Sequence, residues 1–234
     1  PVVLPEYVNK KNKKINPYAF TDELFNLLDK DDVVITGNGS ACVITFQAAK
    51  IKQGQRLYTN SGSASMGYDL PASIGAAIAM NGKRIICLAG DGSLMMNLQE
   101  LQTMQGYNLP IKVFILNNEG YVSIKQTQEA YFSDNISGVG PKSGVTMPNF
   151  IELGKALNIP NIKVTKLSQL SSTHFLKMLN DNKSGIFEII IDPNQGFSPK
   201  LTSRKLDDGS MVSPSLNDMS PFLDKDELAK NILS

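Results

Sequence analysis

The sequence predicts a doubly wound α/β fold, in which a mostly parallel sheet carries helices on both faces. Five short runs are rich in β-branched residues and too apolar to expose a face, which is typical of strands that are buried on both faces. Segments with apolar residues at helical spacing separate these runs. Because strand and helix alternate, right-handed crossovers would place the strands side by side in one sheet.

The elements follow one another without an internal repeat. A first helix is expected from Pro17, because Asn16 can cap it, Pro17 suits its first turn and Phe20 begins an apolar face. The expected strands are Val33–Thr36, Arg84–Ala89, Lys112–Leu116, Ile162–Val164 and Ile186–Ile191. The expected helices lie near residues 40–50, 70–80, 97–107, 148–157 and 168–180.

The two ends of the chain differ in character from its middle, residues 17–196, which would form the domain. Residues 1–16 contain two prolines and the basic run Lys10, Lys11, Lys13 and Lys14, so they are expected to be a linker from a region upstream of Pro1. Residues 197–234 form a polar tail with prolines and a short amphipathic helix, Asp224–Leu233. This tail is expected to be a C-terminal arm wrapped on the domain or on a neighbour, with plain disorder as the alternative.

The composition is that of an ordinary soluble globular protein. Its 234 residues are 41% hydrophobic, enough to bury a substantial core. The 23 Lys and Arg residues balance 22 Asp and Glu residues, so no net field would attract nucleic acid or an acidic membrane. Cys42 and Cys87 lie outside any metal-binding pattern and are expected to be reduced, buried thiols. Without a signal peptide or an apolar stretch of roughly 18 residues, a cytoplasmic location is expected.

Polar loops follow three of the predicted strands, at the edge where open α/β sheets bind ligands. The first is Thr36-Gly37-Asn38-Gly39-Ser40, whose glycines would let an anion approach the backbone at a helix N-terminus. An ordinary turn capped by Ser40 fits this loop equally well. The second loop is Gly90-Asp91-Gly92-Ser93, and the third is Asn117-Asn118-Glu119-Gly120.

The spacing of the second and third loops predicts a metal site. The 24 residues at positions 93–116 suffice for one helix and one strand, so both loops would end adjacent strands at one edge of the sheet. Mg²⁺ prefers carboxylate and amide oxygens together with phosphate oxygens and water. The Asp91 carboxylate, the Asn118 amide oxygen and a backbone carbonyl near Gly120 would supply three ligands. An isolated Gly-Asp-Gly is more often a turn, so the pairing with the third loop carries the prediction.

The paired motif resembles the signature of thiamine diphosphate enzymes. From about Asn16 to Gly196 the chain is similar to the cofactor-binding domain of the acetolactate synthase and pyruvate oxidase group, and Ser61–Ala72 is similar to the segment beneath the cofactor. The resemblance implies the thiamine diphosphate-binding fold, with Met66 propping the cofactor in a bent conformation, although a lone methionine is commonly core filler. The implied cofactor contacts are Gly37, Asn38, Gly39, Ser40, Ala64, Met66, Gly90, Gly92, Ser93, Asn118 and Tyr121, and the implied metal ligands are Asp91, Asn118 and Gly120.

The resemblance also implies an activity and a missing half of the active site. The implied reaction decarboxylates a 2-oxo acid and passes the acyl unit to a carbonyl acceptor, with the bent cofactor supplying its own base. In this family a glutamate of another domain hydrogen-bonds the cofactor, and no glutamate here has the matching context: Glu119 adjoins the metal ligand and Glu100 fits a capping box with Asn97. The glutamate is therefore expected on a partner subunit of a homodimer or homotetramer. FAD would require the missing middle domain, and this chain alone is expected to be inactive.

Other interpretations of the same residues are weaker. Gly37-Asn38-Gly39 after a strand imitates the start of a nicotinamide dinucleotide fingerprint, but Cys42 occupies the third glycine position and no acid lies near Thr59. A non-catalytic cofactor-binding module is an alternative from another class. Metal hydrolase chemistry has little support, because the single histidine, His174, falls on an expected surface helix.

The acceptor pocket is where the chain departs from acetolactate synthases, which carry a tryptophan where this sequence has Thr127. Losing an indole would make the pocket wider and more polar, so the expected acceptor is larger than a second pyruvate, such as a keto sugar. The tail around Asp207-Asp208-Gly209-Ser210 and Met211 resembles thiamine enzymes of cell-surface sugar pathways. Acetolactate synthase itself is the alternative.

Overall fold

The computed structural model describes residues 3–8, 14–132, 135–205 and 208–231, which belong to two units, Pro1–Gln195 and Gly196–Ser234. The first unit holds a six-stranded sheet in the order β2-β1-β3-β4-β6-β5, and every pairing is parallel. Its strands are β1 (Val33–Thr36), β2 (Arg56–Tyr58), β3 (Ile85–Gly90), β4 (Ile111–Asn117), β5 (Asn161–Val164) and β6 (Gly185–Ile190). The predicted parallel sheet is confirmed.

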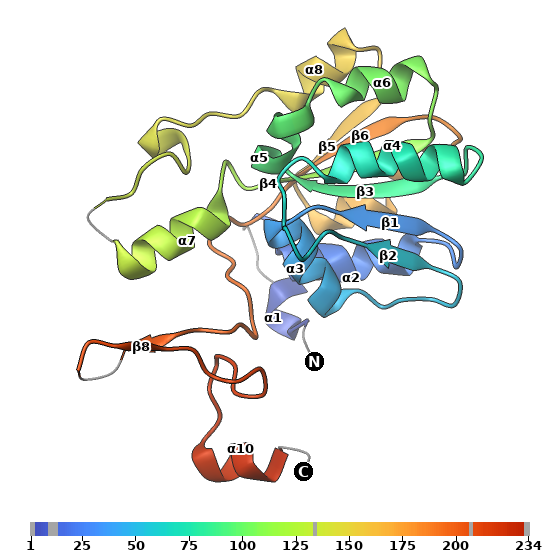
Figure 1. Ribbon diagram of the computed structural model, residues 1–234. Helices are drawn as coiled ribbons and strands as arrows, with labels where there is room; N and C mark the ends of the chain where they lie inside the picture. The colour runs from blue at the N-terminus through green and yellow to red at the C-terminus, as the bar shows by residue number, and fades with distance from the viewer. Residues whose placement is uncertain (1–2, 9–13, 133–134, 206–207, 232–234) are drawn as a thin grey trace. The chain divides into compact units, whose positions relative to one another are not determined.

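Helices cover both faces of this sheet (Figure 1). One face packs against α2 (Pro17–Leu27), α3 (Gly39–Ala48), η3 (Leu167–Ser171) and α9 (Thr173–Asn180). The other packs against α4 (Asp69–Ala79), α5 (Asp91–Leu94), α6 (Glu100–Gly106) and α8 (Phe150–Ala156). Successive strand residues enter opposite layers, as Ile86 and Cys87 of β3 do. The fold is therefore doubly wound, as predicted.

The remaining short elements are α1 (Pro5–Val8), η1 (Met95–Asn97), α7 (Val122–Tyr131) and η2 (Pro141–Ser143). In Figure 1, α7 extends away from the sheet and its two helical layers. It has a single buried residue, Val122. No helix was expected over these residues, because the sequence of α7 has no continuous apolar face.

The start of the domain follows the predicted cap, with one correction. The Asn16 side chain accepts a hydrogen bond from the Tyr18 amide (2.9 Å), which satisfies a free donor at the start of α2. Ile15 was expected in the linker, but it is 4% exposed and forms a parallel bridge with Ile191. Packing against the sheet therefore begins before Pro17.

Three further expectations are wrong in detail. The strand expected at Ile162–Val164 is not buried on both faces, because β5 is an edge strand and Lys163 is exposed. Asn97 and Glu100 form no capping box: α6 begins at Glu100 without a side-chain cap. Cys87 is a buried free thiol as expected, whereas Cys42 is only half-buried.

The second unit contains a short antiparallel pair, β7 (Arg204–Lys205) with β8 (Met211–Val212), and the helix α10 (Lys225–Asn231). The helix expected at Asp224–Leu233 is found from Lys225 to Asn231, and Asp224 precedes it. The residues of the predicted basic run and tail that lie outside the described residues are Lys10, Lys11, Lys13, Leu206, Asp207, Ile232, Leu233 and Ser234. Within the described ranges, every helix is too short or too polar to cross a membrane.

Candidate functional site

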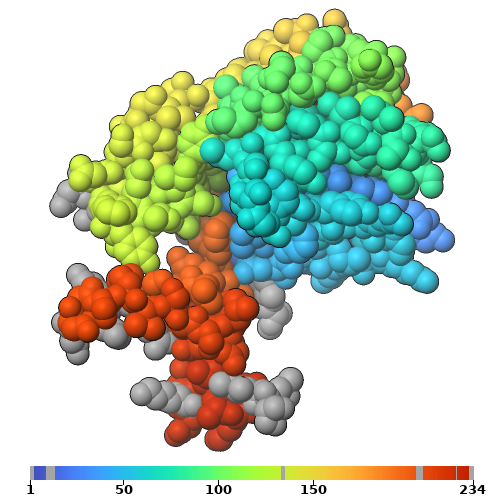
Figure 2. Space-filling view, in the orientation of Figure 1, coloured from blue at the N-terminus to red at the C-terminus, as the bar shows by residue number. Residues whose placement is uncertain are grey.

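The three predicted loops surround one cavity of about 270 Å³. It lies at the carboxyl ends of β1 and β3, where the strand order reverses and where open α/β sheets bind ligands. Twelve of the thirteen predicted site residues line it: Asn38, Gly39, Ser40, Ala64, Met66, Gly90, Asp91, Gly92, Ser93, Asn118, Gly120 and Tyr121. Figure 2 shows two segments that border this region, α7 and the segment before α4, at the surface.

Gly37, the thirteenth residue, is not among the residues that line the cavity. A Cβ at this position would lie 2.2 Å from Asp69 Oδ2, so the absence of a side chain permits close packing. Its carbonyl oxygen accepts a hydrogen bond from Thr59 Oγ1 (3.1 Å). Gly37 therefore anchors the first loop to Asp69 and Thr59 on the side away from the cavity lining.

Asp91 joins the second loop to the third. Its buried carboxylate accepts hydrogen bonds from the amides of Gly92 and Gly120, both at 2.9 Å. Burial raises the pKa of this carboxyl to about 6, although these hydrogen bonds lower it. The third loop turns sharply, because Glu119 has a left-handed backbone (φ 68°) and a side chain at Gly120 would meet the Val139 carbonyl oxygen at 2.2 Å.

Asn118 completes a cluster of oxygens with these two loops. The terminal atom of its carboxamide that faces Asp91 lies 3.2 Å from Asp91 Oδ1 and 2.8 Å from the Gly120 carbonyl oxygen. With the amide nitrogen at this position, Asn118 donates to both oxygens. With the amide oxygen there, three oxygens face one another, an arrangement that a cation would stabilise. The predicted convergence of Asp91, Asn118 and Gly120 is confirmed as geometry.

Asp69 also belongs to this region, although its sequence context did not indicate it. Its side chain is fully buried and accepts a hydrogen bond from Ser93 Oγ (2.8 Å), which itself accepts one from the Gly67 amide (2.9 Å). Burial raises the pKa of Asp69 to about 6. Because Asp69 also packs against Gly37, it contacts the first loop as well as the second. An acid in the first turn of α4 is common for a helix, so the sequence gave no sign of this contact.

The segment before α4 presents Met66 to the cavity with 40% of its surface exposed. Two side chains hold this segment in place: Asn38 Nδ2 donates to the Ala64 carbonyl (2.9 Å), and Asn97 Nδ2 donates to the Gly67 carbonyl (2.7 Å). Ala64 has a left-handed backbone (φ 50°). Asn97, expected to cap a helix, therefore supports the methionine segment.

The amino end of α3 opens on the cavity. The helix begins at Gly39, and Asn38 occupies its N-cap without a capping hydrogen bond from its side chain. Ser40 lies inside the helix, so Ser40 is not the capping residue of this turn. A helix start without a side-chain cap leaves backbone donors for an anion.

α7 contributes a wall that the sequence analysis did not foresee, through Val122, Ser123 and Ile124. Thr127 lies one turn further along, where it is exposed and its hydroxyl donates to the Ser123 carbonyl (3.2 Å). Thr127 is not among the residues that line the cavity, so the structure does not place it in the wall of this pocket, where it was expected.

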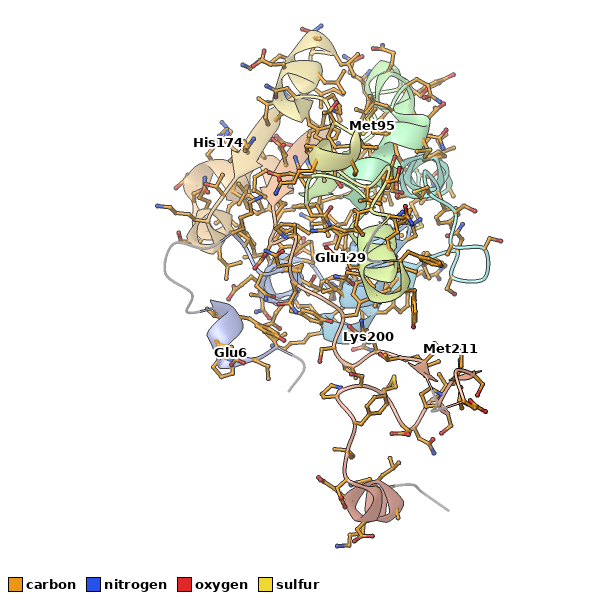
Figure 3. All side chains as sticks on the ribbon, turned by 90° about the vertical axis from the view of Figure 1, so that its left-hand side faces the viewer. Glu6, Met95, Glu129, His174, Lys200 and Met211 are labelled. Carbon is orange, nitrogen blue, oxygen red and sulfur yellow. The ribbon has the colours of Figure 1, made fainter. Side chains whose placement is uncertain are left out.

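The described glutamates and the single histidine lie outside the lining of the cavity. Glu119 faces away and pairs with Lys14 (3.1 Å), its side chain 60% exposed. His174 is exposed on α9, as Figure 3 shows, which agrees with the surface position expected for it.

Comparison with known proteins identifies the family. The family model described as "Thiamine pyrophosphate enzyme, C-terminal TPP binding domain" matches residues 37–187, more than half of the chain. The chain therefore belongs to the thiamine pyrophosphate (thiamine diphosphate) enzymes, as their C-terminal cofactor-binding domain.

Individual relatives indicate the acetolactate synthase type. Acetolactate synthase 2, chloroplastic, of Zea mays is 30% identical over 196 residues, which cover 82% of this chain and 31% of that protein. The acetolactate synthase large subunit of Cyanidium caldarium is 35% identical over 168 residues, 72% of this chain and 28% of that protein. The chain spans less than a third of the length of these relatives.

Proposed function

We propose that this chain forms the diphosphate- and metal-binding half of the active site of an enzyme that decarboxylates a 2-oxo acid and transfers the acyl unit to a carbonyl acceptor. The observation that carries the proposal is the oxygen cluster of Asp91, Asn118 and Gly120 beside the open amino end of α3. A cation and an anion would therefore be bound side by side. Thiamine diphosphate with Mg²⁺ supplies that pair of charges.

The residues fit both groups. Asp91 Oδ1, the Asn118 amide oxygen and the Gly120 carbonyl would hold Mg²⁺, the set of hard oxygen donors that this ion prefers. The start of α3 at Gly39 and Ser40 would bind diphosphate through backbone donors. When bound, thiamine diphosphate supplies the nucleophilic carbon and the base that activates it, while the protein orients it.

The other half of the site would come from a second domain, which explains an exposed Met66. By family likeness Met66 props the cofactor, and backbone groups of Ala64 and Met66 contact its pyrimidine. The glutamate that hydrogen-bonds the pyrimidine would come from a partner subunit, in a cytoplasmic homodimer or homotetramer. FAD, if the enzyme uses it, would bind a middle domain, and this chain alone would turn nothing over.

We also propose that the acceptor is larger than a second pyruvate, such as a keto sugar. Thr127 is small, and its hydroxyl is bonded to its own helix, so α7 leaves room beside the cavity where a tryptophan would fill it. Acetolactate synthase is the second candidate, because the relatives carry that name.

The metal assignment is tested with Asp91→Ala in the complete enzyme. The variant should lose magnesium-dependent thiamine diphosphate binding in calorimetry while keeping its circular dichroism, because a metal site cannot spare its carboxylate. Asp29→Ala, an exposed acid at the amino edge of the sheet, is the matched control and should bind like the wild type. Tight magnesium-dependent binding by Asp91→Ala would contradict the assignment.

A further inference from the structure

A buried glutamate, Glu188, lies behind residues 118–120 of the third loop, which are called the metal turn below because they include two of the expected metal ligands. Glu188 is in β6, between β4 and β5, and is 2% exposed. It aligns with Ile115 of β4 and with Lys163 of β5. A carboxylate buried in a sheet is costly unless it is hydrogen-bonded, so its partners indicate what it does there.

Two hydrogen bonds connect Glu188 to the third loop. Asn117 Nδ2 donates to Glu188 Oε1 (2.7 Å), and Asn117 Oδ1 accepts a hydrogen bond from the Glu119 amide (3.0 Å). The first bond determines which way the Asn117 carboxamide faces. If it turned over, its nitrogen would oppose the Glu119 amide and both bonds would be lost.

The second oxygen of Glu188 takes part in no hydrogen bond among the described residues. It lies 3.4 Å from Lys163 Nζ, an ammonium on the edge strand that is half exposed. The carboxylate is therefore balanced by charge on one side and held by Asn117 on the other. Neither Glu188 nor Asn117 lines the cofactor cavity.

The segment that Asn117 holds is the one that most needs support. Glu119 has a left-handed backbone that non-glycine residues rarely adopt, and it separates Asn118 from Gly120. The side chain of Glu119 points away to Lys14 and contributes nothing on the cavity side. The hydrogen bond from its amide to Asn117 is thus a restraint on the turn between the two expected ligands.

We propose that Glu188 is a positioning residue for the metal turn. By orienting Asn117, it keeps residues 118–120 in the conformation in which Asn118 and Gly120 face Asp91. The proposal rests on the proposed magnesium site and adds to it a residue at the far end of a chain of hydrogen bonds. Groups behind metal ligands commonly tune affinity in this way.

The test is the magnesium requirement of the complete enzyme at saturating thiamine diphosphate. Glu188→Leu and Asn117→Ala should each raise the half-saturating magnesium concentration about tenfold or more, while kcat at saturating magnesium is largely kept. Glu188→Gln retains an acceptor oxygen for Asn117 and should restore a requirement close to that of the wild type. A purely structural role would lower stability without this split and this rescue.

A double-mutant cycle and a control sharpen the result. Glu188→Leu combined with Asn117→Ala should be no worse than either change alone, because both break the same connection. Asp32→Asn is the control: it removes a similarly buried carboxylate, which pairs with Arg84 at the amino ends of the strands, away from the cavity. This variant should be less stable to urea but should have an unchanged magnesium requirement.

The outcomes are distinguishable. If Glu188→Leu does not fold, Asn117→Ala decides the matter, since Asn117 is only half-buried at a strand end. An unchanged magnesium requirement in Asn117→Ala, or additive effects in the cycle, would overturn the proposal. A wild-type enzyme that needs no divalent cation would instead overturn the proposed function.

Discussion

Replacing Asp69 by asparagine should stabilise the cofactor-free chain at neutral pH. Burial raises the pKa of this carboxyl from 3.8 to about 6. Because the folded chain holds the proton more tightly than the unfolded chain, protonation adds stability that is present at low pH and is lost as the pH rises through about 6. At pH 7 and above, ionised Asp69 therefore lowers the free energy of unfolding by about 3 kcal/mol relative to a neutral group.

Asparagine does not keep every hydrogen bond of a protonated Asp69, so the substitution also has a cost in the free energy of unfolding. Its oxygen can still accept from the Leu70 amide (3.0 Å), but its nitrogen would face Ser93 Oγ (2.8 Å). Since that hydroxyl oxygen already accepts from the Gly67 amide, the hydroxyl proton loses its acceptor, at a cost of about 1 kcal/mol. This cost does not vary with pH, so the change of the stability difference with pH isolates the carboxyl.

Urea unfolding of the wild-type and Asp69→Asn chains at about pH 5 and about pH 8 measures that change. The advantage of the variant should grow by about 1.5 kcal/mol between them, because part of the effect is already present at the lower pH. Ser93→Ala removes a hydrogen bond that lowers the pKa of Asp69, so it should steepen the pH dependence of the chain. A stability difference that is equal at both pH values would refute this reasoning.

Three other changes have expected outcomes. Gly92→Ala would bring a Cβ to 2.4 Å from the Tyr121 ring, so it should cost about 1–3 kcal/mol in urea and raise the cofactor concentration for half-saturation, whereas Gly75→Ala, with open space, should do neither. Lys112 is fully buried and its ammonium pairs with Asp181, which is 32% exposed, so Lys112→Met, which fills the same space, should cost less in urea than Lys112→Ala, which leaves a cavity and should cost about 2–4 kcal/mol. Thr127→Trp should slow transfer to keto-sugar acceptors more than transfer to pyruvate; efficient acetolactate formation by the wild type without a larger acceptor would contradict the role given to Thr127.

The fold was predictable where the sequence carries its own signal. Buried parallel strands need continuous apolar runs, and those runs marked β1, β3, β4 and β6 to within about two residues. β2 has only three residues, Arg56–Tyr58, with exposed ends, and lies at the sheet edge, where a partner strand rather than hydrophobicity defines it. α7 was missed for a related reason: Val122 is its single buried residue, so the helix packs little against the core.

Only those residues of the candidate site that lie in loops directly after adjacent strands could be predicted from the sequence. Asp91 and Asn118 follow two adjacent parallel strands, β3 and β4, and this pairing alone places them close together. Asp69 and Glu188 could not be found in this way. Asp69 meets Ser93 across 24 positions and Glu188 meets Asn117 across 71, and no periodicity or motif links the members of either pair.

These two missed acids share a physical function. A metal site without its ion gathers oxygens that repel one another, so the ligands cannot hold their own arrangement, and groups behind them must do so. Asp69 holds the second loop through Ser93, and Glu188 holds the third through Asn117. Burying the Asp69 carboxylate lowers the stability of the empty domain at neutral pH, and an ion that binds only the folded chain adds stability that grows with its affinity. Cofactor and magnesium should therefore raise the free energy of unfolding most when Asp69 and Glu188 are intact, because ligands that are already in position lose less conformational entropy on binding.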